Sequence, residues 1–380
     1  MVPKGWSKVR LGSVAELQRG FDLPSSQRID GSVPIVSSGG VTGYHSEAKS
    51  KAPGVVTGRY GSIGDVFYLE EDYWPLNTSL WVKDFHGNHE KFVYYLLCNF
   101  DFKKFSDKTG VPGVNRNDLH AVRVKLPAIP EQKKIAQILS TWDKAITTTE
   151  QLLANSQQQK KALMQQLLTG KKRLLDENGV RFSGEFKRFH FSDLLNIDQK
   201  SLGAKTDPDL KFDYISLSDV GTGTISRAIE RHTFKTSPSR ARRIVSSGDI
   251  LLATVRPNLQ GFAKVKEQHK HCIASTGFAV LSPKKGTCND YIYHYLFGSH
   301  ITGQINALVV GTNYPAINSS DVSGLCIYCP NYEEQVQIAK VLNSSDELVY
   351  ALQQKLDALK QEKKALMQQL LTGKRRVKIQ

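Results

Sequence analysis

Two long stretches of the chain place apolar residues at intervals of three and four, which is the spacing of one face of an α-helix. The first stretch carries Ile135, Ile138, Trp142, Ala145, Thr149 and Leu152, and the second carries Ile338, Val341, Ser345, Leu348, Leu352, Leu359 and Leu366, with polar lapses such as Ser156 and Ser345. Pro130 followed by Glu131 suits a helix start, and Gly170 and Gly373, each followed by basic residues, suit helix ends. We therefore predict helices over 131–172 and 334–374.

These two helical stretches are copies of one another. The segment Lys161–Lys171 recurs letter for letter as Lys364–Lys374, an offset of 203 positions. The same offset extends upstream and aligns Thr109, Pro112, Asn115, Asp118 and Pro127 with Thr312, Pro315, Asn318, Asp321 and Pro330. Farther upstream the copies diverge in sequence but keep a similar order of patterns. Each copy is therefore a variable body followed by a nearly constant tail.

The bodies contain short apolar segments bounded by Gly, Ser, Asn or Pro, which is typical of strands. These segments are Val55–Thr57, Leu80–Val82, Ile250–Leu252 and Phe278–Val280. We expect an α+β protein, with mixed bodies over 1–130 and 186–333, a linker over 173–185 and a basic tail over 375–380.

Long helices with a single apolar seam need a partner in water. We predict that the two helices pair with each other in antiparallel fashion as a coiled coil and hold the two bodies apart, with an internal pseudo-two-fold relation. The alternative is that each helix packs only on its own body.

Composition adds a hint of the partner. The formal net charge of +15 and the isoelectric point near 9.4 favour a polyanionic partner such as DNA, although a generically basic protein has the same composition. The five cysteines indicate reduced thiols. No apolar run is long enough to span a bilayer, and the first residues lack an apolar signal segment, so we expect a cytoplasmic location.

The duplication, the paired tails and three motifs together resemble the specificity subunit of type I restriction-modification systems, over the whole chain. The motifs are the Pro-x-x-x-Glu-Gln helix starts at 127–132 and 330–335, the Leu-Leu-Thr-Gly-Lys helix ends, and the segment from Gly248-Asp-Ile-Leu to Arg256-Pro257. The resemblance implies that each body is a target recognition domain for half of a bipartite double-stranded DNA site. It also implies that the helices space the halves and dock two methyltransferase subunits.

The same resemblance assigns the chemistry to other subunits. It implies that the methyltransferase subunits carry S-adenosylmethionine and that a motor-nuclease subunit uses ATP and Mg²⁺, with no cofactor in this chain. The sequence agrees, because we find no nucleotide-binding loop, no amino-methyltransferase motif and no catalytic triad pattern. Cys326-x-x-Cys329 has no second cysteine pair, so we predict no metal site. A stand-alone DNA methyltransferase or nuclease, and a protein-only coiled-coil scaffold, are the competing functions.

Candidate DNA-binding residues follow from residue type and position. Arg59-Tyr60 and Arg256-Pro-Asn258 occupy matched places just after an apolar strand, where arginine can read guanine and asparagine can read adenine. The alternative for both arginines is an ion pair inside the body. We predict phosphate contacts for Lys103, Lys104, Lys108, Arg240, Arg242 and Arg243, with a solvated face as the alternative.

Two further sets of residues follow from the repeat. The loops that contain Thr109, Asn115, Thr312 and Asn318 are kept in both copies, which favours a structural or DNA-backbone role over base reading. For helix pairing and partner docking we select eight apolar residues: Ile135, Leu139, Trp142, Leu152, Ile338, Leu342, Leu352 and Leu359.

Overall fold

Four apolar segments expected to be strands are strands, two in each half of the chain.

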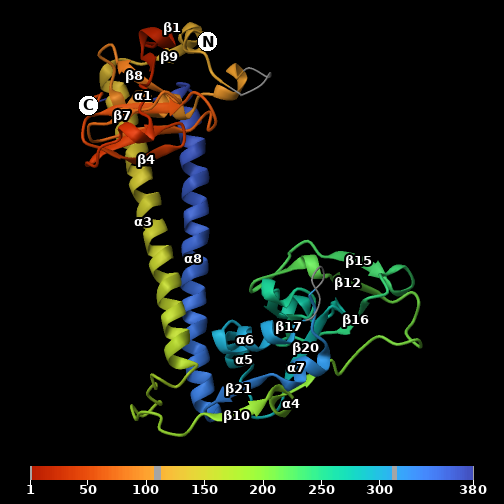
Figure 1. The fold of residues 1–380 in the computed structure, drawn as a ribbon. Helices are drawn as coiled ribbons and strands as arrows, with labels where there is room; N and C mark the ends of the chain where they lie inside the picture. The colour runs from red at the N-terminus through yellow and green to blue at the C-terminus, as the bar shows by residue number, and fades with distance from the viewer. Residues whose placement is uncertain (1, 107–112, 310–314, 380) are drawn as a thin grey trace. The chain divides into compact units, whose positions relative to one another are not determined.

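The computed structural model describes residues 2–106, 113–309 and 315–379, which divide into two units (Figure 1). The first unit comprises Met1–Gln151 and Gln353–Gln380, and the second comprises Leu152–Leu352. Each unit holds one body together with part of each long helix.

The first body is built on a four-stranded antiparallel sheet in the order β2-β8-β5-β6. These strands are β2 (Glu16–Arg19), β8 (Ser79–Asp84), β5 (Gly54–Gly58) and β6 (Val66–Leu69). A second sheet has the order β4-β3-β7, with β3 (Val33–Ser37), β4 (Gly40–His45) and β7 (Trp74–Pro75). The remaining elements are the pair β1 (Ser7–Arg10) and β9 (Arg123–Leu126) and the helices α1 (Glu90–Cys98) and α2 (Arg116–Ala121).

The second body repeats this plan. Its four-stranded antiparallel sheet has the order β11-β20-β17-β18, with β11 (Leu195–Ile197), β20 (Phe278–Pro283), β17 (Ile250–Ala253) and β18 (Phe262–Lys264). A second sheet has the order β15-β12-β19-β16, with β15 (Glu230–Thr233), β12 (Lys211–Ile215), β19 (Ile273–Ser275) and β16 (Ala241–Ile244).

Smaller elements complete the second body. They are the strand pairs β10 (Lys187–His190) with β21 (Cys326–Cys329) and β13 (Val220–Gly221) with β14 (Thr224–Ile225), and the helices α4 (Phe191–Leu194), α5 (Asn289–Leu296), α6 (Ser299–Leu308) and α7 (Ser319–Gly324). The parallel pair β3 and β7 of the first body corresponds to the parallel pair β12 and β19 of the second. The bodies therefore share a topology although their sequences have diverged.

The central strands β5 and β17 are buried along their whole length because each lies between two cores. On β5, Val55 packs into the core that contains α1, whereas its neighbour Val56 packs into the core that contains β3. On β17, Leu252 packs into the core that contains α5, whereas its neighbour Leu251 packs into the core that contains β12. Successive side chains of a strand point to opposite faces, so a strand that is apolar throughout joins two cores.

Two long helices run from one unit into the other: α3 (Ile129–Leu167) has 39 residues and α8 (Tyr332–Leu371) has 40. They lie antiparallel within each unit, as predicted. In the first unit Asp143 pairs with Lys363 and Glu150 with Lys360, so one sequence number rises as the other falls. In the second unit Lys160 pairs with Asp346 and Arg173 with Glu334, which shows the same opposite directions.

The helix ends are anchored in the cores of the bodies. Leu370 and Leu371, at the end of α8, belong to the core of the first body, and Leu167 and Leu168, at the end of α3, belong to that of the second. Gly170 and Gly373 follow with φ values of 71° and 72°, as expected for left-handed helix caps. Each body is thus closed by the start of one long helix and the end of the other, so packing of each helix only on its own body is not what the structure shows.

Candidate nucleic-acid interface

The Glu-Gln pair at the start of each long helix ties that helix to its body. Gln132 donates to the carbonyl of Pro127 (3.0 Å) and accepts from the backbone N–H of His89 (3.0 Å) at the start of α1. Gln335 makes the same two bonds to Pro330 and Cys288, at 3.0 Å each. Both glutamine side chains are buried, so these bonds satisfy polar groups that water does not reach.

The neighbouring glutamate binds the end of the opposite helix. Glu131 is 2% exposed and accepts two hydrogen bonds from Arg376, at 2.7 and 2.8 Å, and one from Trp6 Nε1, at 3.0 Å. In the second unit Arg173 occupies the place of Arg376 and donates two bonds to Glu334, which is fully buried. The near-constant tails thus have a structural reason, because each supplies the cation that a buried carboxylate requires.

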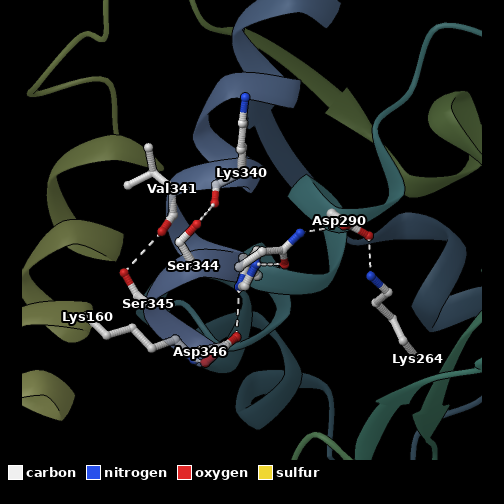
Figure 2. Close-up of polar contacts among 10 residues, drawn as sticks. Lys160, Lys264, Asp290, Lys340, Val341, Ser344, Ser345 and Asp346 are labelled. Carbon is white, nitrogen blue, oxygen red and sulfur yellow. Dashed lines mark hydrogen bonds and ion pairs between the residues drawn. The ribbon is translucent and has the colours of Figure 1, made fainter. Parts of the chain in front are cut away.

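A second polar network joins the helices to the second body (Figure 2). Lys160 of α3 pairs with Asp346 of α8. His294 of α5 has one ring nitrogen 2.8 Å from Asn343 Oδ1 and the other 3.7 Å from Asp346. Asn343 in turn donates to Asp290 (2.6 Å), which also pairs with Lys264 of β18.

Nearby, Ser344 and Ser345 bond back to the carbonyls of Lys340 and Val341, at 3.1 and 3.0 Å, within α8 (Figure 2).

Burial sets the charge state in this network. His294 is fully buried, and its pKa is lowered mainly because burial disfavours the imidazolium, although Asn343 and Asp346 act in the opposite direction. The pKa of Asp290 is also lowered: burial alone would raise it, but the hydrogen bonds from Lys264 and Asn343 outweigh that effect. In the first unit the phenol of Tyr95 takes the place of the imidazole: it donates to Asp143 (2.5 Å), which also pairs with Lys363.

The apolar residues selected for helix pairing and partner docking separate into two groups. Ile135, Leu139, Ile338 and Leu342 are fully buried in the cores of the bodies, so they hold helix to body and are not accessible to a partner. Trp142, Leu352 and Leu359 are half-buried. Leu152 is 49% exposed. Leu152 is therefore the residue of this set that stays largely accessible to a partner.

The loops kept in both copies contribute helix caps. Asn115 caps α2 by accepting from the backbone N–H of Asn117, and Asn318 caps α7 by accepting from that of Asp321. This supports the structural role expected for them. Thr109, Thr312 and Lys108 lie outside the described residues.

The candidate phosphate-binding residues differ in their surroundings. Lys103 and Lys104 are exposed, and Lys104 pairs with Asp101 (3.2 Å). Arg242 lies over the ring of Phe234, 4.7 Å from its centroid. Arg243 is largely buried and forms an ion pair with Asp198 (2.8 Å). Arg243 is therefore already bound inside the body, whereas Lys103 and Arg240 face solvent.

Arg59 and Arg256 do not occupy matched places, contrary to our prediction. The backbone N–H of Arg59 donates to the carbonyl of Thr78, and its carbonyl accepts from the N–H of Val114. Thr254 makes the equivalent bonds: its N–H donates to the carbonyl of Gly277, and its carbonyl accepts from the N–H of Ile317. Thr254 is therefore the counterpart of Arg59, and Arg256 is the counterpart of Gly61. The side chains differ too: the Arg59 guanidinium lies over the Tyr60 ring (4.5 Å), whereas Arg256 is exposed.

The structure brings Arg256 and Arg240 together at one cleft of the second body. The cleft has a volume of about 800 Å³, and its lining also includes Leu217, Ala253 and Leu259. No acidic side chain is among the described residues that line it. Asn258 lies exposed on the same loop as Arg256. A cleft whose lining holds two arginines and no carboxylate suits a polyanion.

The cysteine pair lies on β21, where Cys326 and Cys329 are both buried; all five cysteines are free thiols. Over the described ranges, the side chains close enough to share an ion are Glu16, Asp84 and His86, of which two are exposed, and Glu16 already pairs with Lys83 (3.4 Å). In the same ranges, no helix is long and apolar enough to cross a bilayer.

Comparison with known proteins places this arrangement in a family. The family model described as the type I restriction modification DNA specificity domain matches residues 3–158 and 183–361. The MjaVIII type I restriction enzyme specificity subunit of Methanocaldococcus jannaschii is 27% identical over 312 residues, 75% of this chain and 70% of that protein. The putative MjaX specificity subunit of the same organism is 28% identical over 310 residues, 76% of this chain and 68% of that protein.

A solved structure has the same fold. The S subunit of a type I restriction-modification system from M. genitalium aligns with a TM-score of 0.67 at 16% identity, over 97% of this chain and 96% of that one. The two family matches in this chain coincide with the two copies of its repeated body and tail. The chain therefore belongs to the type I restriction-modification DNA specificity family and is a specificity subunit.

Proposed function

We propose that each unit of this chain reads one half of a two-part DNA target and that the chain itself performs no catalysis. The observation that carries the proposal is the shared topology of the two bodies combined with different side chains at equivalent surface turns, of which Gly61 and Arg256 are an example. Equivalent scaffolds with different surfaces suit the reading of two different half-sites. The net charge of +15 supports a DNA partner.

The long helices suit a role in setting the separation of the half-sites. Each has about 40 residues, which corresponds to roughly 60 Å at ~1.5 Å per residue. The Arg173–Glu334 and Arg376–Glu131 pairs, whose carboxylates are buried, tie the end of each helix to the start of the other. A rigid connection is what a fixed half-site spacing requires.

The proposed protein partners are two methyltransferase subunits, joined by motor-nuclease subunits in the complete complex. A duplicated chain offers two similar surfaces to two identical partners, which supports this stoichiometry. S-adenosylmethionine would be bound by the methyltransferase subunits, and ATP and Mg²⁺ by the motor-nuclease subunits. The complex would act in the cytoplasm.

The experiment combines this chain with the methyltransferase subunit of its own system. Genome-wide mapping of methylated adenines should give one two-part sequence with a constant gap, and omission of this chain should abolish the methylation. Selection from a random DNA pool by the purified complex should recover the same sequence, with binding that weakens steeply as salt is raised.

Two results would contradict the proposal. Methylation or cleavage of DNA by the isolated chain would support a stand-alone enzyme. A complex that assembles normally but shows no preference for any DNA sequence would support a protein-only scaffold.

A further inference from the structure

The turn that follows the central strand begins and ends on equivalent backbone hydrogen bonds in both bodies, but in the second body it is one residue longer and carries different side chains. In the first body it joins β5 to β6, and in the second it joins β17 to β18. Gly58 and Ala253, at the ends of β5 and β17, occupy equivalent places, since their N–H groups bond to the carbonyls of Asp65 and Gly261. Gly64 and Gln260 are the residues just before those two carbonyl partners, so Gln260 is the counterpart of Gly64. Arg256 is likewise the counterpart of Gly61.

Both pairs of equivalent positions have the left-handed backbone conformation. The φ values are 75° at Gly61 and 100° at Gly64, and 50° at Arg256 and 52° at Gln260. Glycine adopts this conformation without steric cost, whereas arginine and glutamine do so only under strain. The second body therefore places two long side chains where the first body has the residue that the backbone favours. Strained backbone of this kind persists where the surrounding structure holds it in place, and it clusters at binding and active sites.

The side chains on this turn have the chemistry of DNA readers. Arginine can bind guanine through two hydrogen bonds, and glutamine can bind adenine in the same way. Between them, Leu259 is 65% exposed, so its apolar side chain is accessible to a partner. Arg256 and Leu259 border the cleft that also includes Arg240.

We infer that the turn Arg256–Gln260 is a base-reading element of the second unit, with Arg256 and Gln260 as specificity-determining residues. Leu259 supplies an apolar contact to the bases, and Arg240 supplies a cation beside them. The turn of the first unit, with Gly61 and Gly64 at the same positions, lacks these readers. The inference rests on the proposed function and adds to it which residues of the second body select the sequence.

The test replaces the two residues by those of the first copy, in the double variant R256G/Q260G. Glycine suits both backbone positions, so the variant should fold with an unchanged or higher midpoint of thermal unfolding. In complex with the methyltransferase subunit, the wild-type and variant chains select sequences from a DNA pool randomised over both half-sites. We expect the variant to lose roughly tenfold or more of the preference at one or two base pairs of one half-site, with the other half-site unchanged.

Two further variants identify the kind of contact. R256K keeps the positive charge but not the two-bond geometry, so it should lose the base preference while the salt dependence of binding stays the same. R181A removes an exposed arginine from the segment between α3 and β10 and should leave both half-sites unchanged.

The inference is overturned if R256G/Q260G selects the wild-type sequence, or if it binds every sequence more weakly with no change in preference. Failure of the proposed function would look different, because the wild-type complex itself would then select no two-part sequence.

Discussion

Arg173, just beyond the end of α3, donates two hydrogen bonds of 2.7 and 2.5 Å to Glu334 at the start of α8. The same relationship recurs between Arg376 and Glu131. Each long helix therefore ends by neutralising the first turn of the other, and the two contacts are copies of one another. This reciprocity explains why the helix ends and helix starts have changed so little since the duplication, while the bodies diverged.

Removing the guanidinium of Arg173 should destabilise the second unit. In R173A the carboxylate of Glu334 stays fully buried without its cation, which should lower the free energy of unfolding by about 3 kcal/mol. Hydrogen exchange should accelerate in the first turns of α8 and in β21. E334Q, which removes the buried charge itself, should be milder. Equal effects of R173A on the two units would contradict the local role of this pair.

The leucines at the helix ends should each stabilise one body. Leu167 is fully buried in the core of the second unit, and Leu370 is 1% exposed in that of the first. L167A and L370A should each cost about 2–5 kcal/mol of unfolding free energy. L152A is the matched control, since Leu152 is 49% exposed and should cost much less. Urea unfolding of the full chain measures all three, and hydrogen exchange shows which body opens.

The stability of the second unit should decrease in acid below about pH 6.5. The pKa of His294 is lowered in the folded chain, so below the unfolded value near 6.5 the unfolded chain binds a proton that the folded chain does not. The stabilisation is complete above pH 6.5 and decreases by up to about 1.4 kcal/mol per pH unit until the folded pKa is reached. The charged groups around this histidine or its partners are Asp346, Asp290, Lys160 and Lys264.

H294Q is the variant that checks this pH dependence. It should be less stable than the wild type at pH 8 but should lose less additional stability between pH 6.5 and pH 5. Parallel curves for the two proteins would show that another group is responsible.

The exposed lysines of the first unit should contribute affinity without specificity. We expect K103A and K104A to weaken DNA binding to all sequences alike and to reduce the salt dependence by about one counterion for each phosphate that the variant no longer neutralises. Fluorescence titrations at several salt concentrations, with matched and scrambled DNA, measure this. A change in the selected sequence would instead indicate that these lysines touch the bases.

Lengthening both long helices should change the gap in the target but not its half-sites. One heptad inserted after Gln151 of α3 and another after Leu352 of α8 adds about two turns to each helix at the boundary between the units and preserves the apolar seam. Methylation mapping should then recover the same two half-sites with a longer gap. An unchanged gap would contradict a spacing role for these helices.

Local sequence patterns were enough to predict several elements. The three-and-four spacing and the flanking glycines predicted helices over 131–172 and 334–374, close to the observed Ile129–Leu167 and Tyr332–Leu371. The central strands β5 and β17 were recognisable because their residues are apolar throughout. Both signals are local, since hydrophobic periodicity and turn residues act within one element.

Other features of the candidate site depended on contacts between distant segments. Glu131 and Gln132 were visible as a motif, but the pairing of Glu131 with Arg376 joins residues 245 positions apart. Gln260 was not selected at all, and Arg256 was matched with Arg59 instead of Gly61. The bodies have diverged and their turns differ in length, so only the backbone hydrogen bonds reveal which residues are equivalent.

Repeated letters and hydrophobic period are properties of the unfolded chain, and they suffice to establish a duplicated unit with two long helices and diverged bodies. Only the folded molecule shows which helix end packs into which body. It also shows which positions of the first body correspond to Arg256 and Gln260. Those features depend on buried charge pairing and on backbone conformation, and both are set by segments that meet only when the chain has folded.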